Sequence, residues 1–161
     1  MTQEEYNNYL AKASQLCAKN ERCAQDLRKK IFQWGIPDHY GEKIIEELKK
    51  SDFINHQRYA LAFARDKLRF NHWGKKKIAY ALRAKDIEDS FVREALEEIP
   101  VDQYNHALRE ELLKKDHALQ TTDPGERKNK LCQFLLQKGF ESGKVFEFVN
   151  IRMQERDQKN E

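Results

Sequence analysis

Residues 53–87 read FINHQRYALAFARDKLRFNHWGKKKIAYALRAKDI and contain two helical patterns that meet at a basic hinge. Apolar residues recur in both patterns every three or four positions, as on an α-helix with one buried face. The same period runs outward through almost the whole chain, and strand-like alternation is absent. Only 6 of the 161 residues are glycine and 3 are proline, which favours long helices over turn-rich sheet. The sequence therefore predicts an all-α protein.

The helical pattern repeats along the chain with a spacing of about fifty residues, as in repeat proteins. Four aligned sets of positions, continued by a fifth set in the next helix, argue against a chance match. The equivalent positions are Leu27, Ile78 and Leu131; Ile31, Leu82 and Leu135; Gly35, Asp86 and Gly139; Ile36, Ile87 and Phe140; and, one helix later, Ile45, Leu96 and Val149.

Each repeat is predicted to hold three helices. We expect the repeats at residues 1–52, 53–100 and 101–156, followed by a polar tail at 157–161. Because each unit of a linear array buries its apolar face mainly against its neighbours, the pattern predicts an elongated, curved array. A single compact bundle with accidental regularity is the alternative. The expected helices are 3–19, 23–34, 38–50, 55–70, 74–85, 88–99, 102–118, 123–138 and 142–155.

Charge is unevenly distributed along the chain. The 30 basic and 27 acidic residues give a formal net charge of only +3. Residues 65–85, however, hold eight basic residues and one acid, whereas residues 86–116 hold ten acids and four bases. This polarity produces a field that can orient a docking partner.

The order of short motifs around the hinge resembles the RecX family, bacterial regulators of the recombinase RecA. The resemblance covers about residues 16–150 and implies three tandem three-helix repeats. It also implies a protein that is not an enzyme, and that binds RecA filaments on single-stranded DNA and inhibits ATP hydrolysis, strand exchange and repressor cleavage. The motifs are Phe53-Ile54-Asn55, Arg58-Tyr59-Ala60, a basic segment ending in Trp73-Gly74, Lys77-Ile78 with Leu82 four residues after the isoleucine, and the Asp86-Ile87 turn.

Two positions depart from the pattern of that family. Cys23 stands where the family commonly has a serine that caps the following helix, so the capping box with Asp26 is half lost. His56 follows Asn55 where the family usually has an aspartate. These changes leave the repeat intact, and we therefore carry over the family's repeat but not the details of its contacts.

The hinge at Asn71–Trp73 is expected to gather basic side chains at one corner. Arg65 and Arg69 are four residues apart on one helix, and three lysines begin the next. Such a patch attracts DNA phosphates, with an affinity that falls as salt rises, or carboxylates of RecA; the sequence leaves both open. A solvated basic face with Trp73 packed into the core is the alternative. The expected RecA-filament or DNA contacts are Arg65, Arg69, Trp73, Lys75, Lys76, Lys77 and Arg83.

No residue pattern indicates catalysis, a metal site or a cofactor. The Gly139–Lys144 segment resembles a phosphate-binding loop, but it has one residue too few between its glycines and no Ser or Thr after the lysine. A turn between two helices is expected there. The five histidines and three cysteines form no metal-binding spacing, and Cys132 is expected to be a small buried hydrophobic residue.

The remaining expectations concern location and partners. A secretory signal is not expected, and no apolar run approaches the roughly 20 residues that a membrane helix needs. We expect a cytoplasmic monomer with reduced cysteines, whose partners are the RecA filament and the single-stranded DNA within it. Two other classes stay open: a free-standing DNA-binding helical-repeat protein, and a pure scaffold that leaves RecA turnover unchanged.

Overall fold

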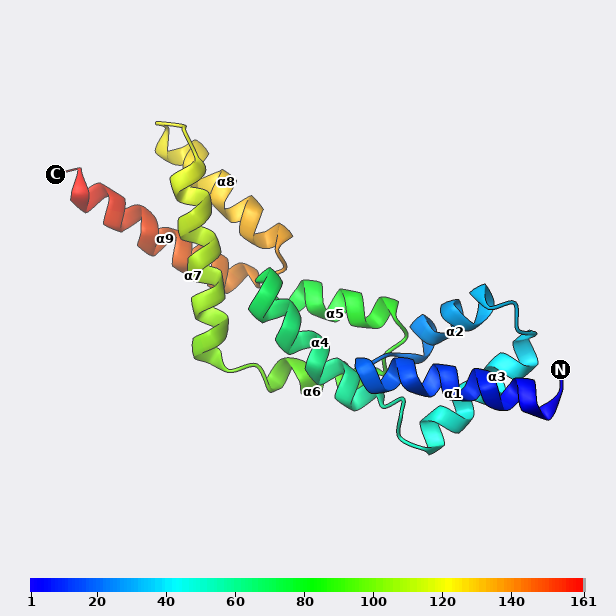
Figure 1. Cartoon of the computed structure of the whole chain (residues 1–161). Coiled ribbons are helices and arrows are strands. Elements are labelled where there is room, and N and C mark those ends of the chain that lie inside the picture. Colours follow the sequence, from blue (N-terminus) through cyan, green and yellow to red (C-terminus); the bar gives the residue numbers. More distant parts are fainter. Residues whose placement is uncertain (161) are drawn as a thin grey trace. The chain divides into compact units, whose positions relative to one another are not determined.

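The computed structural model describes residues 1–160, in which helices are joined by short connections and no strand occurs (Figure 1). The prediction of an all-α fold is therefore confirmed, with three successive sets of three helices. The expected and observed helix bounds differ most at the end of the ninth helix, which runs to Lys159. The helices are α1 (Gln3–Lys19), α2 (Ala24–Gln33), α3 (Asp38–Lys50), α4 (His56–Asn71), α5 (Lys75–Ala84), α6 (Asp89–Glu97), α7 (Val101–Ala118), α8 (Pro124–Gln137) and α9 (Ser142–Lys159).

The helices form two compact units. The first unit contains Met1–Ala62 and Leu82–Ala95, and the second contains Phe63–Ala81 and the chain from Leu96 onward. The middle repeat thus contributes residues to both units. The predicted repeat boundaries describe divisions along the chain, not these units, and they stay a prediction. Within residues 1–160 no helix combines the length and apolarity needed to cross a membrane.

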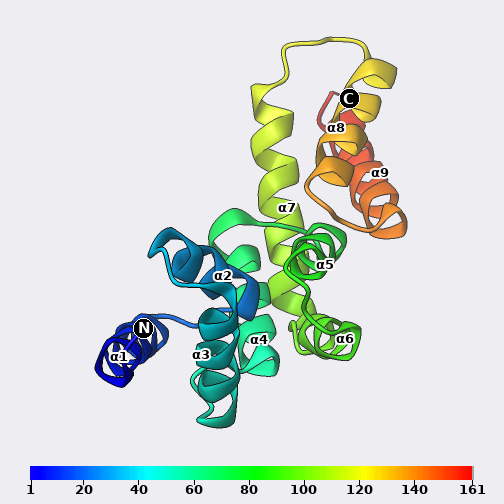
Figure 2. The same ribbon diagram turned by 90° about the vertical axis from the view of Figure 1, so that its right-hand side faces the viewer.

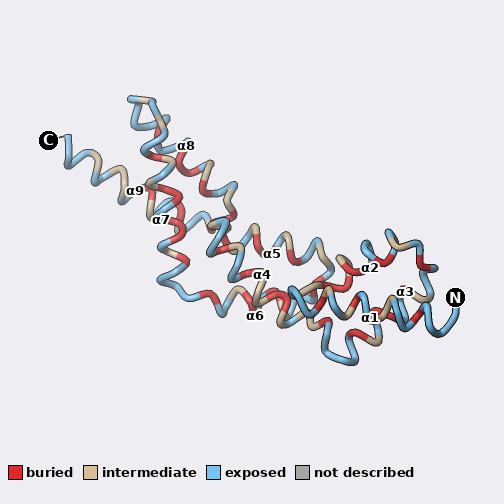
Figure 3. Tube along the Cα trace, in the orientation of Figure 1, coloured by how far each residue is buried: buried red, intermediate tan, exposed pale blue. Residues whose placement is uncertain are grey.

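The core of the first unit forms where α1 and α2 pack against α3. The helical period of the sequence explains this packing, because Leu27 and Ile31 of α2 face Ile44, Ile45 and Leu48 of α3 in one buried cluster. Figure 3 shows the result as buried stretches that alternate with exposed ones along each helix. The apolar face predicted from the sequence is therefore the face that is buried.

The repeat is visible in burial and in backbone conformation. Leu27, Ile78 and Leu131 are all fully buried. The turn residues Gly35, Asp86 and Gly139 all adopt left-handed backbone, with φ of 75°, 58° and 95°, as expected after a helix end. The exception is the fifth set, in which Leu96 is only half-buried and its neighbour Ala95 takes the buried position.

A histidine replaces the missing cap at the start of α2. Cys23 makes no side-chain cap hydrogen bond. The amide of Ala24 instead donates to Nε2 of His56 at 3.1 Å, so the ring proton lies on Nδ1, which donates to Glu88 at 2.9 Å. The His56 side chain is 10% exposed. The two departures from the family pattern, Cys23 and His56, are thus linked: one loses the cap and the other supplies it.

Replacing His56 with alanine is expected to lower the free energy of unfolding by about 1–2 kcal/mol, since it leaves the buried Ala24 amide without an acceptor. Urea unfolding followed by circular dichroism measures this loss. His117→Ala, at an exposed position in the last turn of α7, is the matched control and is expected to change stability by less than about 0.5 kcal/mol. An equal effect of the two substitutions would contradict a capping role for His56.

In the second unit, α7, α8 and α9 pack against one another (Figure 2). A buried carboxylate joins them: Asp116 of α7 accepts from Arg127 of α8 at 2.7 Å and from Arg152 and Arg156 of α9 at 2.7 and 3.2 Å. Burial alone would raise the pKa of Asp116, but the hydrogen bonds from Arg152 and Arg127 and the charge of Arg156 hold that pKa below its usual value. The carboxylate therefore stays charged and ties the three helices together.

Candidate functional site

The connection between α4 and α5 is fixed by hydrogen bonds to the turn between α8 and α9. The amide of Gly74 donates to the carbonyl oxygen of Lys138 at 2.7 Å, and the amide of Lys76 donates to that of Gly139 at 3.0 Å. The ammonium group of Lys138 in return donates to the carbonyl oxygen of Asn71 at 2.7 Å. The segment that the sequence suggests as a hinge is thus held by two backbone hydrogen bonds on its α5 side and by the Lys138 side chain on its α4 side.

Two glycines allow this close backbone contact. A Cβ atom at position 74 would lie 2.2 Å from the carbonyl carbon of Gly139 and from the amide nitrogen of Phe140. A Cβ atom at position 139 would lie 2.4 Å from Cβ of Lys77, and Gly139 also has positive φ. Only residues without a side chain fit here, so the first turn of α5 and its lysines have a defined position.

Gly74→Ala is expected to cost about 3 kcal/mol of stability or more, because the added methyl group meets backbone atoms that cannot turn aside as a flexible side chain can. Thermal and urea unfolding measure the loss. Gly143→Ala is the matched control: a Cβ there meets nothing within 4 Å, and alanine favours the helical conformation of α9. A Gly74→Ala variant as stable as Gly143→Ala would show that the two turns do not pack as described.

Two lysines of the first turn of α5 lie against aromatic rings. The ammonium group of Lys75 lies 5.1 Å from the ring centre of Tyr104, whose hydroxyl accepts from the Lys75 amide at 3.0 Å and donates to Glu141 at 2.7 Å. Burial and the hydrogen bond to Glu141 raise the pKa of Tyr104, so the hydroxyl keeps its proton. The ammonium group of Lys77 lies 4.6 Å from the ring centre of Trp73. Lys76 is exposed.

Trp73 is half-buried in the second unit. Its ring lies edge-on to Phe63 with 6.4 Å between ring centres, and Lys67 approaches it at 4.8 Å, so the cations of Lys67 and Lys77 both contact the ring. Such cation–π contacts contribute roughly 0.5–1 kcal/mol at exposed sites. Trp73 thus helps to hold Lys67 and Lys77 in place and keeps part of its surface open to solvent.

Arg65 and Arg69 line a hollow between α4 and the first turns of α7. The hollow has a volume of about 550 Å³. His72, Asp102, Gln103 and His106 complete its polar walls, and Leu68 and Ala107 contribute apolar surface. The structure thus places two of the predicted site residues in one concave site and adds to them residues from the third repeat.

Whereas Arg65 and Arg69 belong to the second unit, Arg83 belongs to the first. Its guanidinium pairs there with Asp89 at 3.0 Å, and both side chains are more than half exposed. The structure therefore brings Trp73 and Lys77 together, and Arg65 and Arg69 together, but it does not assign Arg83 to either cluster.

Sequence reasoning missed the contributions of α7 and of the α8–α9 turn to this surface. Tyr104, His106 and Lys138 lie 29 to 67 residues from their partners in the chain, so no local spacing reveals them. Lys67 is different: it stands in the counted basic run, six residues before Trp73. A search for lysines flanking the tryptophan could have found it.

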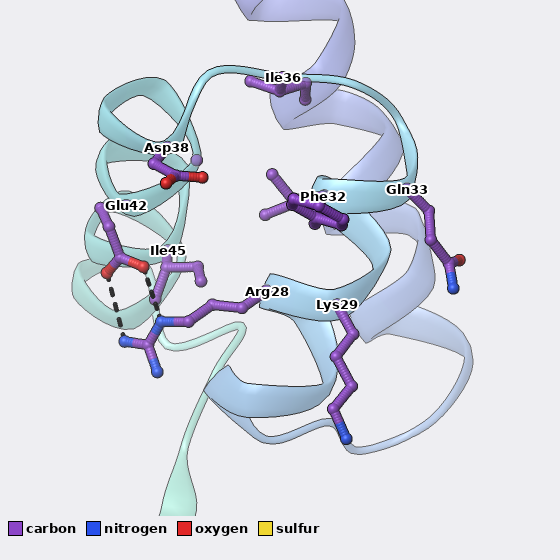
Figure 4. Close-up of a pocket in the computed structure, with 10 residues that line it drawn as sticks. Arg28, Lys29, Phe32, Gln33, Ile36, Asp38, Glu42 and Ile45 are labelled. Atoms are coloured by element: carbon purple, nitrogen blue, oxygen red, sulfur yellow. Dashed lines mark hydrogen bonds and ion pairs between the residues drawn. The ribbon is translucent and has the colours of Figure 1, made fainter.

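A second hollow, of about 740 Å³, lies between α2 and α3 in the first unit (Figure 4). Phe32, which is 75% exposed, lies beside it. On one side Arg28 donates to Glu42 at 2.7 Å, so these two charges neutralise each other. None of the residues predicted to bind a partner lies in this hollow.

The segment that resembles a phosphate-binding loop is a turn between two helices, as predicted. Gly139 follows the end of α8, α9 begins at Ser142, and the ammonium group of Lys144 donates to Asn105 at 2.8 Å. Cys132 is buried, as expected, and burial raises the pKa of its thiol. No group of three or more His, Cys, Asp or Glu residues within positions 1–160 is arranged to hold a metal ion.

Comparison with known proteins points to one family. Residues 55–96 match the family model described as RecX, second three-helix domain, and residues 102–149 match that described as RecX, third three-helix domain. The regulatory protein RecX of Clostridium acetobutylicum is 33% identical over 90% of this chain and 70% of its own length. That of Oceanobacillus iheyensis is 31% identical over 68% of this chain, but only 40% of its own length is covered.

Solved structures show the same fold. The crystal structure of a regulatory protein RecX superposes with a TM-score of 0.78 at 24% identity, covering 91% of this chain and 73% of that one. RecX from Lactobacillus salivarius superposes with a TM-score of 0.76 at 22% identity, covering 98% and 99% of the two chains. At these identities the similarity concerns the fold alone.

Proposed function

The chain belongs to the RecX family of regulatory proteins, and we propose that it binds RecA nucleoprotein filaments and inhibits their recombinase, ATPase and co-protease activities. In this role the protein modulates DNA repair, recombination and the SOS response in the cytoplasm. It acts by binding, as a monomer without a cofactor, and catalyses no reaction of its own. The observation that carries the proposal is the match of two consecutive repeats to RecX models.

The basic surface of the second unit supports a role in filament binding. Lys75 and Lys77 are held by packing, because the α4–α5 connection is fixed to the α8–α9 turn and these two lysines rest on aromatic rings. A surface fixed in this way loses little conformational entropy when it binds. The proposed contact residues are Arg65, Arg69, Trp73, Lys75, Lys76 and Lys77 of this unit, together with Arg83 of the first unit.

Inhibition follows if binding favours one arrangement of RecA subunits. A ligand shifts a conformational equilibrium only by the difference in its affinity for the two states. Tandem three-helix repeats offer several binding surfaces in fixed order, so they can contact neighbouring subunits of a filament at the same time. Such a contact would oppose the rearrangements that accompany ATP turnover and strand exchange.

A free-standing DNA-binding protein is the second candidate, favoured by one observation: the lysine-rich first turn of α5 contains no acid. Phosphate contacts would make its affinity fall steeply with salt. Co-sedimentation separates the two candidates, with RecA filaments on single-stranded DNA compared with the same DNA alone. We expect the protein to pellet with the filaments far more than with bare DNA. Equal binding to both would favour the DNA-binding candidate.

A further inference from the structure

We infer that the hollow between α4 and α7 receives an acidic segment of the partner protein, with an Asp or Glu side chain placed between Arg65 and Arg69. This inference rests on the proposed function, which makes RecA filaments the partner. It assigns the contact to protein and not to DNA, a choice that the sequence leaves open.

The arginines of the hollow are available for a partner's carboxylate. The Arg65 side chain is 69% exposed, and the nearest acid, Asp66, lies 3.7 Å from it in an exposed pair, a contact of little energetic value. Arg69 is exposed and lies over the ring of Phe70 at 5.4 Å; within residues 1–160 no carboxylate lies within 4.0 Å of it. Two guanidinium groups one helical turn apart can hold a carboxylate with paired hydrogen bonds.

The rim of the hollow favours a peptide over a nucleic-acid backbone. Leu68 and Ala107 line its base, where they are 4% and 3% exposed. Asp102 on the rim can accept a hydrogen bond from a peptide amide, a donor that a phosphodiester lacks. A nucleic-acid site instead follows the strand as an extended positive groove, whereas this site is one hollow between two helices.

Contacts between the surrounding helices fix the shape of the hollow in the free protein. His72 and Glu111 lie 2.9 Å apart, and Lys138 approaches the same carboxylate at 3.9 Å. The hydroxyl of Tyr104 in α7 accepts a hydrogen bond from the Lys75 amide at the start of α5. These contacts fix α7 against the α4–α5 connection, so binding requires little rearrangement.

The test is a double charge reversal, Arg65→Glu with Arg69→Glu. Co-sedimentation measures binding to RecA filaments, and fluorescence anisotropy measures binding to a bare single-stranded oligonucleotide. We expect filament binding to weaken at least about tenfold, since attraction to a carboxylate becomes repulsion, and oligonucleotide binding to change less than about twofold. Lys29→Glu with Lys30→Glu, an equal charge change on exposed positions of α2, is the control and should leave filament binding unchanged.

Three results would overturn the inference, and they are distinguishable. Filament binding by the folded Arg65 and Arg69 variant that equals wild-type binding would exclude the hollow as the contact. An equal loss of filament and oligonucleotide binding would assign the arginines to DNA phosphates. Failure of the wild-type protein to bind filaments would contradict both the proposed function and this inference. Circular dichroism and the urea midpoint establish that each variant is folded.

Discussion

Replacing Asp116 with alanine is expected to lower the free energy of unfolding by about 3–5 kcal/mol, the range for a buried ion pair that loses one partner. The Asp116 side chain is fully buried, and Arg127 and Arg152 are 8% and 12% exposed. Without the carboxylate, these guanidinium groups stay buried with no counter-charge at that position. The loss is large because the residue removed joins three helices.

The matched control is Glu126→Gln, which breaks an exposed pair with Lys130 one turn away on α8 and is expected to cost less than about 0.5 kcal/mol. Urea unfolding followed by circular dichroism compares the two. A loss below about 1 kcal/mol for Asp116→Ala would show that the three arginines find solvent or other partners when the carboxylate is absent.

The same carboxylate predicts a dependence of stability on pH. Because the pKa of Asp116 is lower in the folded protein than in the unfolded chain, its contribution is fully present above the unfolded value of about 4. That contribution is lost as pH falls through the folded value. The stability difference between wild type and Asp116→Asn should therefore shrink as pH falls below about 4. A difference that stays constant down to pH 2 would contradict this ionisation.

Replacing Lys75, Lys76 and Lys77 with glutamate is expected to abolish inhibition of RecA. Lysines in the first turn of a helix oppose the helix dipole and cost a few tenths of a kcal/mol each, so stability alone does not account for all three. Each replacement changes the local charge by two units, which turns attraction to an anionic partner into repulsion. Inhibition by the wild-type protein should itself weaken as salt rises.

The contacts of the lysines determine how this experiment is controlled. Lys75 and Lys77 rest on Tyr104 and Trp73, so the triple variant loses packing as well as charge. Lys76→Glu alone leaves both contacts in place, and it should weaken inhibition in a protein with the wild-type urea midpoint. Full inhibition by the folded triple variant would show that the binding surface lies elsewhere in the molecule.

The repeat could be predicted from the sequence because its signals are local. Apolar residues at helical spacing mark buried faces, and Gly35, Asp86 and Gly139 mark turns by their own backbone preferences. Leu96 shows the limit of this reasoning. The alignment makes it equivalent to the buried Ile45 and Val149, but in the structure Leu96 is half-buried while its neighbour Ala95 is buried.

Polar contacts between helices could not be predicted in the same way. Asp116 meets Arg152 across 36 residues, and His56 meets the amide of Ala24 across 32. Such pairs depend on the shift and rotation of one packed helix relative to another, and no local sequence pattern encodes these two quantities. For the same reason the sequence could predict a cluster of arginines and lysines, but not that α7 would turn part of it into a hollow.

RecA ATPase activity on single-stranded DNA, with this protein titrated in, tests the central claim most directly. The account predicts that turnover falls as the protein is added, reaches a low plateau, and recovers when the wild-type protein is replaced by the variant with glutamate at positions 75, 76 and 77. Turnover that stays unchanged at every concentration, with RecA fully assembled on the DNA, would contradict the proposal that this protein inhibits the filament.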